Sequence, residues 1–241
     1  MSAIGVGRRP ATQRGIEYSL SAARPSRIIP RMTIEPAHFG LLAAAYAVGS
    51  IPFAFLIARL RGVDIRKVGS GNVGATNVFR SVSKPLGLLT FLLDTVKGFV
   101  PAYGLPLAAQ AAGLPAPAWL GLAGGAAAIA GHTWPVWLRF RGGKGVATGA
   151  GVLLAVSPWS VALALAVWLL VFALSRYVSL ASIAAALVAA AAGWGFHRGE
   201  RLRPVALTAL AALIVVRHRS NIRRLISGDE ARLSGRGRRS A

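Results

Sequence analysis

The sequence predicts an all-α integral membrane protein with about seven transmembrane helices. Hydrophobic residues make up 54% of its 241 positions and charged residues only 15%, well below the content of about 25% in soluble domains. Because a helix rises about 1.5 Å per residue, about 20 apolar residues cross a bilayer core. Four runs without Asp, Glu, Lys or Arg reach that length: 36–58, 98–138, 145–175 and 177–197.

Turn residues divide these runs into the expected helices. A Pro-, Gly- and Ala-rich turn at 112–118 interrupts the second run, and Ser157-Pro158 interrupts the third, since Pro has no N–H for a helical hydrogen bond. The expected helices are about 38–60, 86–107, 119–138, 146–156, 159–175, 179–196 and 205–216. Totals of five or six helices remain alternatives.

The distribution of basic residues predicts the orientation. If the loop after the first helix is cytoplasmic, eighteen Lys and Arg residues lie on that side, and only Arg198, Arg201 and Arg203 lie on the other. Cytoplasmic loops of membrane proteins carry the excess of positive charge. We therefore expect the N-terminus outside and the C-terminus in the cytoplasm of a bacterial cell, with the basic loops in contact with anionic membrane lipids.

The two ends of the chain differ from the apolar body. Residues 1–31 contain six Arg and one acid, without the compact apolar core of a secretory signal. We expect an Arg-rich, disordered extension, with translation from Met32 as the alternative. Residues 32–233 would then form one membrane domain, and 234–241 a basic tail.

Composition also excludes several classes of function. The chain has no Cys, which excludes disulfides, thiolate nucleophiles and Cys-ligated metals. We expect neither a metal nor a cofactor. A nucleic-acid partner is not expected despite the net charge of +21, because the basic residues lie in short loops between apolar helices.

The first loop (61–85) has the composition of an anion-binding loop. It contains VGSGNVGATNVFR at 68–80, in which Gly69, Gly71 and Gly74 let backbone N–H groups converge. Arg80 can hold phosphate oxygens in a two-pronged fork. The neutral donors are Ser70, Asn72, Thr76 and Asn77. A dinucleotide site is not expected, because an apolar helix and not a strand precedes the glycines; a flexible surface turn is the alternative.

The second loop (139–145) reads RFRGGKG and offers a compact cradle with one point charge. Gly142, Gly143, Lys144 and Gly145 are its candidate phosphate-binding residues. It is not a Walker A loop, because Gly and not Ser or Thr follows Lys144. An ordinary basic turn is the alternative. His132, seven residues upstream of Arg139, is expected to be packed and not to act as a base.

The third basic element (217–225) reads RHRSNIRRL. If the preceding helix continues through it, His218, Asn221 and Leu225 share one face. Glu230 can pair with these arginines. Ser179 and Ser182 begin a helix from the same cytoplasmic side, where capping and polar packing are the simpler roles.

Asp94 and Lys97 are charged residues within the second helix. Their i, i+3 spacing lets them pair with each other, which is the simpler expectation, since charge is costly inside a membrane. Alternatively, Asp94 orients a cation or hydroxyl in the site.

Together, these segments resemble the bacterial acyl-phosphate:glycerol-3-phosphate acyltransferase family (PlsY type). The resemblance covers about 38–233 in order and spacing. It is carried by GSIPF at 49–53, GSGNVGATN at 69–77, DTVKG at 94–98, GH at 131–132, GGKGVAT at 142–148, RYVSLAS at 176–182 and HRSNIRRL at 218–225. Ser220 departs from it, since an acidic residue is common there in the family.

The resemblance implies a seven-helix enzyme of the bacterial inner membrane. It would transfer an acyl group from acyl phosphate to the 1-hydroxyl of glycerol 3-phosphate, the first acylation step of phospholipid synthesis, giving lysophosphatidate and inorganic phosphate. An upstream acyl-carrier-protein phosphate acyltransferase would supply the acyl phosphate. By matching position, Ser70, Arg80, Lys144, Ser182, His218 and Asn221 would bind substrate phosphates, with Asn72 and Thr76 lining the site.

We assign no general base. None of the four histidines has Asp five positions later, so the H-x4-D motif of the soluble-donor acyltransferases is missing. We expect a substrate phosphate to take the hydroxyl proton, with His218 and Asp94 as weak candidates for a protein base. A membrane transporter of phosphate or a small organic anion is the alternative function, although no internal repeat supports it.

Overall fold

The computed structural model describes residues 34–233, and within them it consists of helices and connecting loops without a strand. The expected extension and tail, and the choice between Met1 and Met32, lie outside the described residues. The helices are α1 (Pro36–Ser50), α2 (Phe53–Arg59), α3 (Ala75–Ser81), α4 (Lys84–Ala111), α5 (Trp119–Thr133), α6 (Val146–Val156), α7 (Pro158–Ser175), α8 (Val178–Phe196), α9 (Leu202–Arg217) and α10 (Arg219–Ser227), with a 3-10 turn, η1, at Val136–Leu138.

Each of the seven expected helical segments contains a helix, which confirms the all-α class. Four helical segments are long and apolar enough to cross a membrane: 36–59, 84–111, 158–175 and 178–196. A fifth is the bent pair α9 and α10, taken together as one span. The number of crossings stays a prediction, since α5 and α6 are shorter than a full span. The orientation of the termini also stays a prediction.

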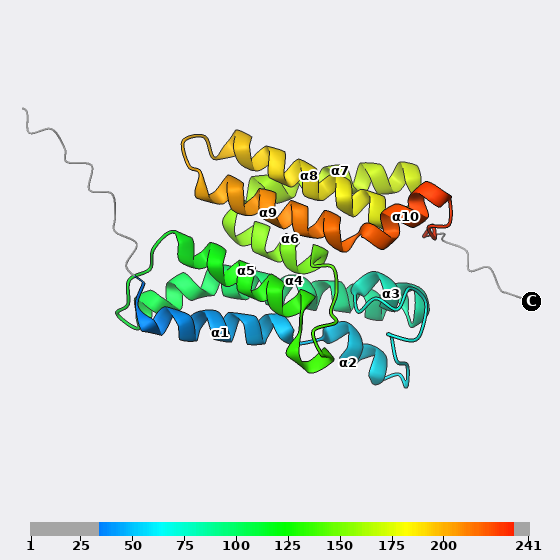
Figure 1. Cartoon of the computed structure of the whole chain (residues 1–241), viewed down its shortest axis with the longest axis horizontal. Coiled ribbons are helices and arrows are strands. Elements are labelled where there is room, and N and C mark those ends of the chain that lie inside the picture. Colours follow the sequence, from blue (N-terminus) through cyan, green and yellow to red (C-terminus); the bar gives the residue numbers. More distant parts are fainter. Residues whose placement is uncertain (1–33, 234–241) are drawn as a thin grey trace, which may run out of the picture. The chain divides into compact units, whose positions relative to one another are not determined.

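The helices form two groups joined by α6 (Figure 1). α1, α4 and α5 pack together on one side, and α7, α8 and α9 on the other, while α6 packs against α4, α5, α7 and α9. The short helices α2, α3 and α10 lie at one end of the bundle (Figure 1). This end therefore collects all three basic elements of the sequence.

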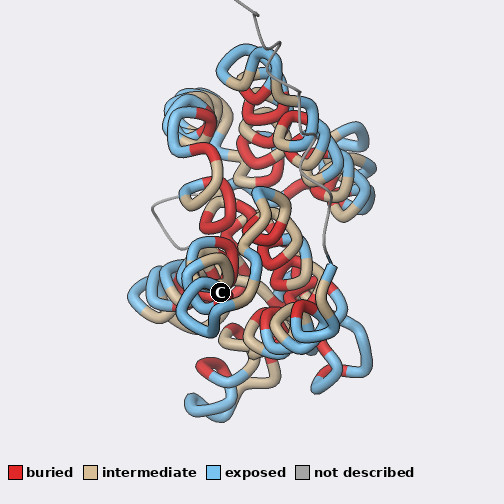
Figure 2. The backbone as a smooth tube through the Cα atoms, turned by 90° about the vertical axis from the view of Figure 1, so that its left-hand side faces the viewer, coloured by how far each residue is buried: buried red, intermediate tan, exposed pale blue. Residues whose placement is uncertain are grey.

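Glycines allow the closest helix contacts. A Cβ at Gly151 would collide with the backbone of Thr95, and one at Gly98 with the backbone of Thr148, so α4 and α6 touch through their main chains. Small residues serve this purpose in membrane proteins, where lipid provides no hydrophobic drive for helices to associate. Figure 2 shows the buried stretches where helices meet and the exposed ones facing outward. Exposed leucines on α7, among them Leu169 and Leu170, suit contact with lipid.

Besides shifts of a few residues at helix ends, three departures from the sequence prediction shape the site. The first helix is not continuous over 38–60 but breaks at Ile51–Pro52, where Pro removes a helical hydrogen bond. The third ends at Thr133 and not at 138, because Trp134 leaves the helical conformation and Pro135 follows. The helix through 217–225 is also interrupted: α9 and α10 meet at His218 with a bend of 55°.

Candidate active site

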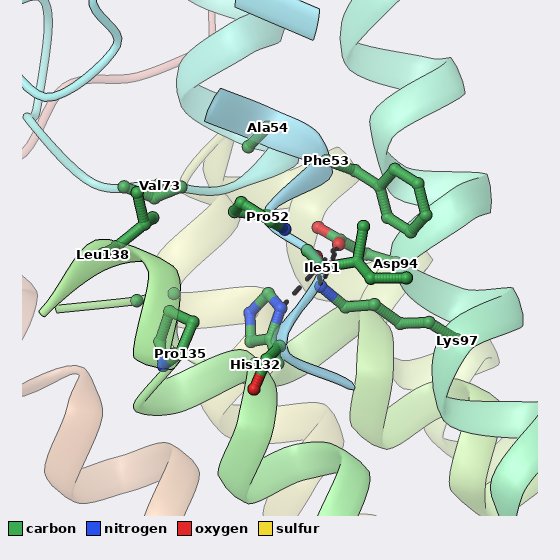
Figure 3. Close-up of a pocket in the computed structure, with 13 residues that line it drawn as sticks. Ile51, Pro52, Phe53, Ala54, Val73, Asp94, Lys97, His132, Pro135 and Leu138 are labelled. Carbon is green, nitrogen blue, oxygen red and sulfur yellow. Dashed lines mark hydrogen bonds and ion pairs between the residues drawn. The ribbon is translucent and has the colours of Figure 1, made fainter. Parts of the chain in front are cut away.

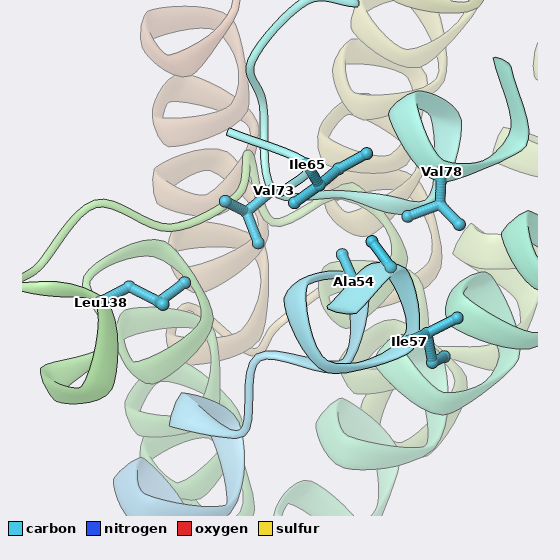
Figure 4. Close-up of a cluster of buried hydrophobic side chains, with 7 residues drawn as sticks. Ala54, Ile57, Ile65, Val73, Val78 and Leu138 are labelled. Carbon is cyan, nitrogen blue, oxygen red and sulfur yellow. The ribbon is translucent and has the colours of Figure 1, made fainter. Parts of the chain in front are cut away.

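The first loop is a packed structure and not a flexible turn. Ile65 and Val73 from the loop and Val78 from α3 are buried in one apolar cluster with Ala54 and Ile57 of α2 (Figure 4). Leu138, at the end of η1, belongs to the same cluster and connects it to the second loop. Burial of these side chains holds the two loops together at one end of the bundle.

Asn77 fixes the course of the first loop from beneath. Its side-chain Nδ2 donates to the carbonyl oxygens of Ile65 (3.0 Å), Val68 (3.1 Å) and Asn72 (3.1 Å). Its Oδ1 accepts from the N–H of Ser70 at 3.2 Å. We expected Asn77 to be a donor for a bound anion, and this is wrong, because its buried amide is already used by the loop itself.

The remaining candidates of the first loop lie near its surface. Ser70 is exposed, and its Oγ is 3.4 Å from the N–H of Asn72. Thr76 is half-buried in the first turn of α3. Arg80, one turn later, donates from Nη2 to the carbonyl of Ala231 at 3.0 Å, which joins the loop to the C-terminal segment.

The second loop is bonded on both sides through its main chain. Gly142 N–H donates to the carbonyl of Thr133, and Gly143 N–H to that of His132, both at 3.1 Å. Arg217 Nη2 donates to the carbonyls of Gly142 (3.1 Å) and Gly143 (3.0 Å). The N–H groups of both glycines are therefore bonded to protein, and a role of Gly142 and Gly143 in phosphate binding stays a prediction.

The charged side chain of Lys144 connects the second loop to the third basic element. Its ammonium donates to Oδ1 of Asn221 on α10. Burial lowers the pKa of Lys144 to about 8; Glu230 opposes this shift, and the nearby Arg224, Arg217 and Arg80 reinforce it. We call these four basic residues (Arg80, Lys144, Arg217 and Arg224) the cationic cluster.

Glu230 is the carboxylate among these cations. Its Oε1 accepts from Ser179 Oγ and from Asn221 Nδ2, and its Oε2 from Arg224 Nε, each at 2.7 Å. Although burial raises the pKa of Glu230, these hydrogen bonds outweigh burial and lower it overall. The expected pairing of Glu230 with the basic set is confirmed. Ser179 bonds to this carboxylate and does not cap its helix.

His218 and Ser182 lie on the same side as the cluster, each bonded to its own helix. His218 is buried at the break between α9 and α10, and its Nδ1 lies 2.7 Å from the carbonyl of Ile214. Since a carbonyl only accepts, Nδ1 carries the hydrogen and Nε2 remains for a ligand. Ser182 Oγ donates to the carbonyl of Val178 at 2.8 Å and accepts from Trp168 Nε1 at 3.2 Å.

Asp94 pairs with Lys97, as the simpler expectation had it. Lys97 Nζ lies 2.7 Å from Asp94 Oδ1 and donates to the carbonyl of Ile51 at 2.8 Å. His132 Nδ1 is 3.7 Å from the same carboxylate oxygen, and all three side chains are buried (Figure 3). Together with Gly142 and Gly143 they line one small pocket. Asp94 thus contacts Lys97 on its own helix and His132 on α5, and neither contact brings it to the cationic cluster.

Two helices begin at this end of the bundle and direct their N-termini toward it: α6 directly after Gly145 and α8 after Tyr177. Neither has a side-chain cap bond at its first turn. Free N–H groups and the helix dipole make such ends favourable for anions. With four cations and one carboxylate, the site as a whole has excess positive charge. In the described part of the chain, no group of His, Asp and Glu could hold a metal ion.

Sequence reasoning did not single out Arg217 and Arg224 as residues of this site. Both lie within the arginine-rich run 217–225, in which the sequence distinguishes no arginine from the others. Arg224 pairs with Glu230 at i, i+6 across the end of α10 at Gly228, and Arg217 reaches the second loop from the last residue of α9.

Comparisons with known proteins agree with this geometry. The model of the family described as glycerol-3-phosphate acyltransferase matches residues 39–228. A protein of that name from Aquifex aeolicus is 46% identical over 193 residues, covering 80% of this chain and 97% of the relative. One from Geobacter sulfurreducens is 48% identical over 195 residues, covering 80% and 95%.

Solved structures give the same result. The crystal structure of PlsY, an integral membrane glycerol 3-phosphate acyltransferase, in its glycerol 3-phosphate form has a TM-score of 0.74 at 44% identity, covering 82% of this chain and 96% of that one. The lysophosphatidic acid form has a TM-score of 0.72 at 43% identity. These findings support an acyltransferase over the transporter alternative, and with the apolar helices they identify a multi-pass membrane protein.

Proposed function

Because this chain belongs to the glycerol-3-phosphate acyltransferase family, we propose that it transfers an acyl group from acyl phosphate to the 1-hydroxyl of glycerol 3-phosphate. The products are 1-acylglycerol 3-phosphate and inorganic phosphate, in the first acylation of phospholipid biosynthesis. The observation that carries this proposal is the convergence of Lys144 from the second loop and Asn221 from α10, with Arg80 beside them.

Both substrates carry phosphate, and the site is built for phosphate. The cationic cluster and the N-termini of α6 and α8 stabilise two anionic groups and the charge that develops on the departing phosphate. The ligands we propose are Ser70, Asn72, Thr76, Arg80, Lys144, Ser182, His218 and Asn221. Gly142, Gly143 and Gly145 contribute the narrow shape of the second loop.

The chemistry requires no nucleophile from the protein. Oxygen of the acceptor hydroxyl forms a bond to the acyl carbon, the bond from that carbon to the phosphate oxygen breaks, and phosphate leaves with the electron pair. The hydroxyl proton goes to a substrate phosphate oxygen. Ser182 is bonded to its own helix, and Asp94, which has no contact with the cationic cluster among the described residues, is held by Lys97. Holding two reactants in register supplies much of the rate enhancement.

Acyl phosphate as donor is the finer part of the proposal. It is an activated mixed anhydride, and its leaving group is the phosphate that this site can bind. The leaving group of a thioester donor is a thiol, with no phosphate bonded to the acyl carbon. An upstream enzyme that makes acyl phosphate from acyl carrier protein would supply it.

The decisive assay measures phosphate release from palmitoyl phosphate by detergent-purified protein, with and without glycerol 3-phosphate, and palmitoyl-CoA as a parallel donor. Release that depends on glycerol 3-phosphate, with lysophosphatidate formed, is the expected result. Turnover with the thioester alone would overturn the donor, and no turnover with either would overturn the reaction. Uptake of labelled phosphate into proteoliposomes tests transport directly.

We further propose that the site faces the cytoplasm from the bacterial inner membrane. Basic residues crowd the end of the bundle that holds the site, and cytoplasmic loops carry such an excess. The chain has no Cys, so single cysteines can be introduced at Arg61 and at Arg198, which lie on loops at opposite ends. In intact inverted vesicles, an impermeant maleimide should label the first and spare the second; the reverse pattern would contradict the orientation.

A further inference from the structure

We propose that Arg217 is a positioning residue for this reaction: its guanidinium holds the Gly142–Gly143 turn against the junction of α9 and α10, so that Lys144 lies opposite Asn221. The inference rests on the proposed function and extends it. Arg217 is the last residue of α9 and stands directly before His218. It therefore connects the second loop to the helix junction that carries two of the proposed phosphate ligands.

The contacts of Arg217 are with main chain. One guanidinium nitrogen, Nη2, donates to the carbonyl oxygens of two consecutive residues, Gly142 at 3.1 Å and Gly143 at 3.0 Å. Hydrogen bonds from a charged donor are about twice as strong as neutral ones. Because Nη2 is directed to these carbonyls, it is not directed to a substrate phosphate.

The opposite side of the turn is fixed independently. The N–H groups of Gly142 and Gly143 bond to the carbonyls of Thr133 and His132 at the end of α5. Gly143 also lies directly against the His132 ring, where a side chain would not fit. The four main-chain polar groups of the turn are thus all bonded, two of them by Arg217. Without Arg217, the turn keeps only its attachment to α5 and loses its attachment to α9.

Loss of this attachment moves the residue that follows. Lys144 comes directly after Gly143, and its ammonium must reach Asn221 on α10. Lys144 follows the turn and Asn221 follows the α9–α10 junction. The separation of these two residues therefore depends on the distance between the turn and the junction, which Arg217 spans. A shift of about 1 Å in a reacting group can cost about 10²-fold in rate.

Arg217→Met tests the role, with Arg219→Met as its matched control. Both variants remove one arginine from the same segment, but Arg219 is exposed and Arg217 alone bonds to the second loop. We expect Arg217→Met to lower kcat/KM by about 10²-fold and Arg219→Met to leave it near the wild-type value. Arg217→Lys, which retains a charged donor, should recover part of the loss. Gel filtration and thermal unfolding in detergent show that each variant is folded.

A double-mutant cycle separates positioning from direct contact with phosphate. If Arg217 acts through the turn, Arg217→Met combined with Gly143→Ala costs less than the product of the two single effects, because both disturb the same element. Multiplicative effects would overturn the proposal. So would an Arg217→Met enzyme as active as the Arg219→Met control.

Two further measurements, a pH profile and the mobility of a spin label, distinguish a positioning role of Arg217 from a general loss of stability. The second also distinguishes it from a failure of the proposed reaction. The alkaline limit of the pH profile should move upward in Arg217→Met, because Arg217 is one of the cations that depress the pKa of Lys144. A spin label on Cys introduced at the exposed Arg141 should become more mobile in Arg217→Met and not in Arg219→Met. This second measurement needs no turnover: unchanged mobility would overturn the positioning role, whereas an inactive wild-type enzyme would overturn only the reaction.

Discussion

The ammonium group of Lys144 donates to the amide oxygen of Asn221, joining two residues 77 positions apart in the sequence. Asn221 in turn donates to Glu230 at 2.7 Å. Lys144 comes from the loop before α6 and Asn221 from α10, so this contact joins separate elements at one end of the bundle. It holds the lysine through a neutral acceptor, which leaves its positive charge available to a substrate phosphate.

Lys144→Ala should lower kcat/KM by about 10²–10³-fold, the loss typical of one preorganised donor at a developing charge. Lys84→Ala is the matched control, because Lys84 is exposed at the start of α4 and belongs to no contact of the site. Steady-state phosphate release measures both variants. Equal activity of the two would remove Lys144 from the site.

The activity should fall as the pH rises through about 8. Burial lowers the pKa of Lys144 to that value, so the lysine is charged below it and progressively neutral above it. On the acid side, the second ionisation of substrate phosphate, near pH 6, sets a limit. The pH dependence of kcat/KM tests this, and Lys144→Arg should extend activity to higher pH because arginine stays charged. An alkaline limit that is the same in the Arg variant would assign it to another group.

The sequence was sufficient for the helices and for the choice of basic elements, because apolar length and charge are local properties. It was insufficient for the partners of individual polar groups. The sequence gives no partner for the N–H groups of Gly142 and Gly143, and only the fold shows that they donate to carbonyls at the end of α5. The amide of Asn77 likewise turns inward, since three carbonyls of its own loop converge on it.

The break between α9 and α10 was also beyond local reasoning, unlike the break at Ile51–Pro52, which Pro52 could have indicated. No Pro or Gly in the sequence around His218 indicates the bend of 55° there. It follows from packing, in which the buried His218 bonds back to Ile214 while Asn221 turns toward Lys144. The helical face expected for His218 and Asn221 does not exist, yet both residues still reach the site.

Gly143→Ala should impair activity far more than Gly104→Ala. A Cβ at Gly143 would strike the His132 ring, whereas one at Gly104 in α4 meets open space. The added methyl group must therefore displace the second loop, and Lys144 with it. We expect a large fall in kcat for Gly143→Ala and wild-type kinetics for Gly104→Ala. A Gly143→Ala enzyme with normal kcat would show that the loop tolerates displacement.

Removing one partner of the buried Asp94–Lys97 pair should destabilise the fold by about 3–5 kcal/mol, because it leaves an uncompensated buried charge. Asp94→Asn and Lys97→Met test this by unfolding in detergent. The double replacement Asp94→Leu with Lys97→Met should recover much of the loss, since an apolar pair needs no counter-charge. Single variants of unchanged stability would mean that the pair contributes little.

Asn77→Asp should be as damaging as Asn77→Ala, although Asp has nearly the shape of Asn. The amide Nδ2 donates to the carbonyls of Ile65, Val68 and Asn72, and a carboxylate would instead repel all three. An unpaired buried carbonyl costs about 1–3 kcal/mol, so both variants should loosen the first loop.

The control for Asn77 is Ser81→Ala, which removes one donor to the same side chain, the Ser81 Oγ bond of 3.2 Å to Asn77 Oδ1, and leaves the three carbonyls paired. Its cost should be about 1 kcal/mol, the value of one ordinary hydrogen bond. Thermal unfolding gives the stability of each variant, and the KM for both substrates reports on Ser70 and Arg80, which the loop carries. If Asn77→Asp behaved like Ser81→Ala, the amide donors would not be what holds the loop, and its order would come from the buried cluster of Ile65, Val73 and Val78 alone.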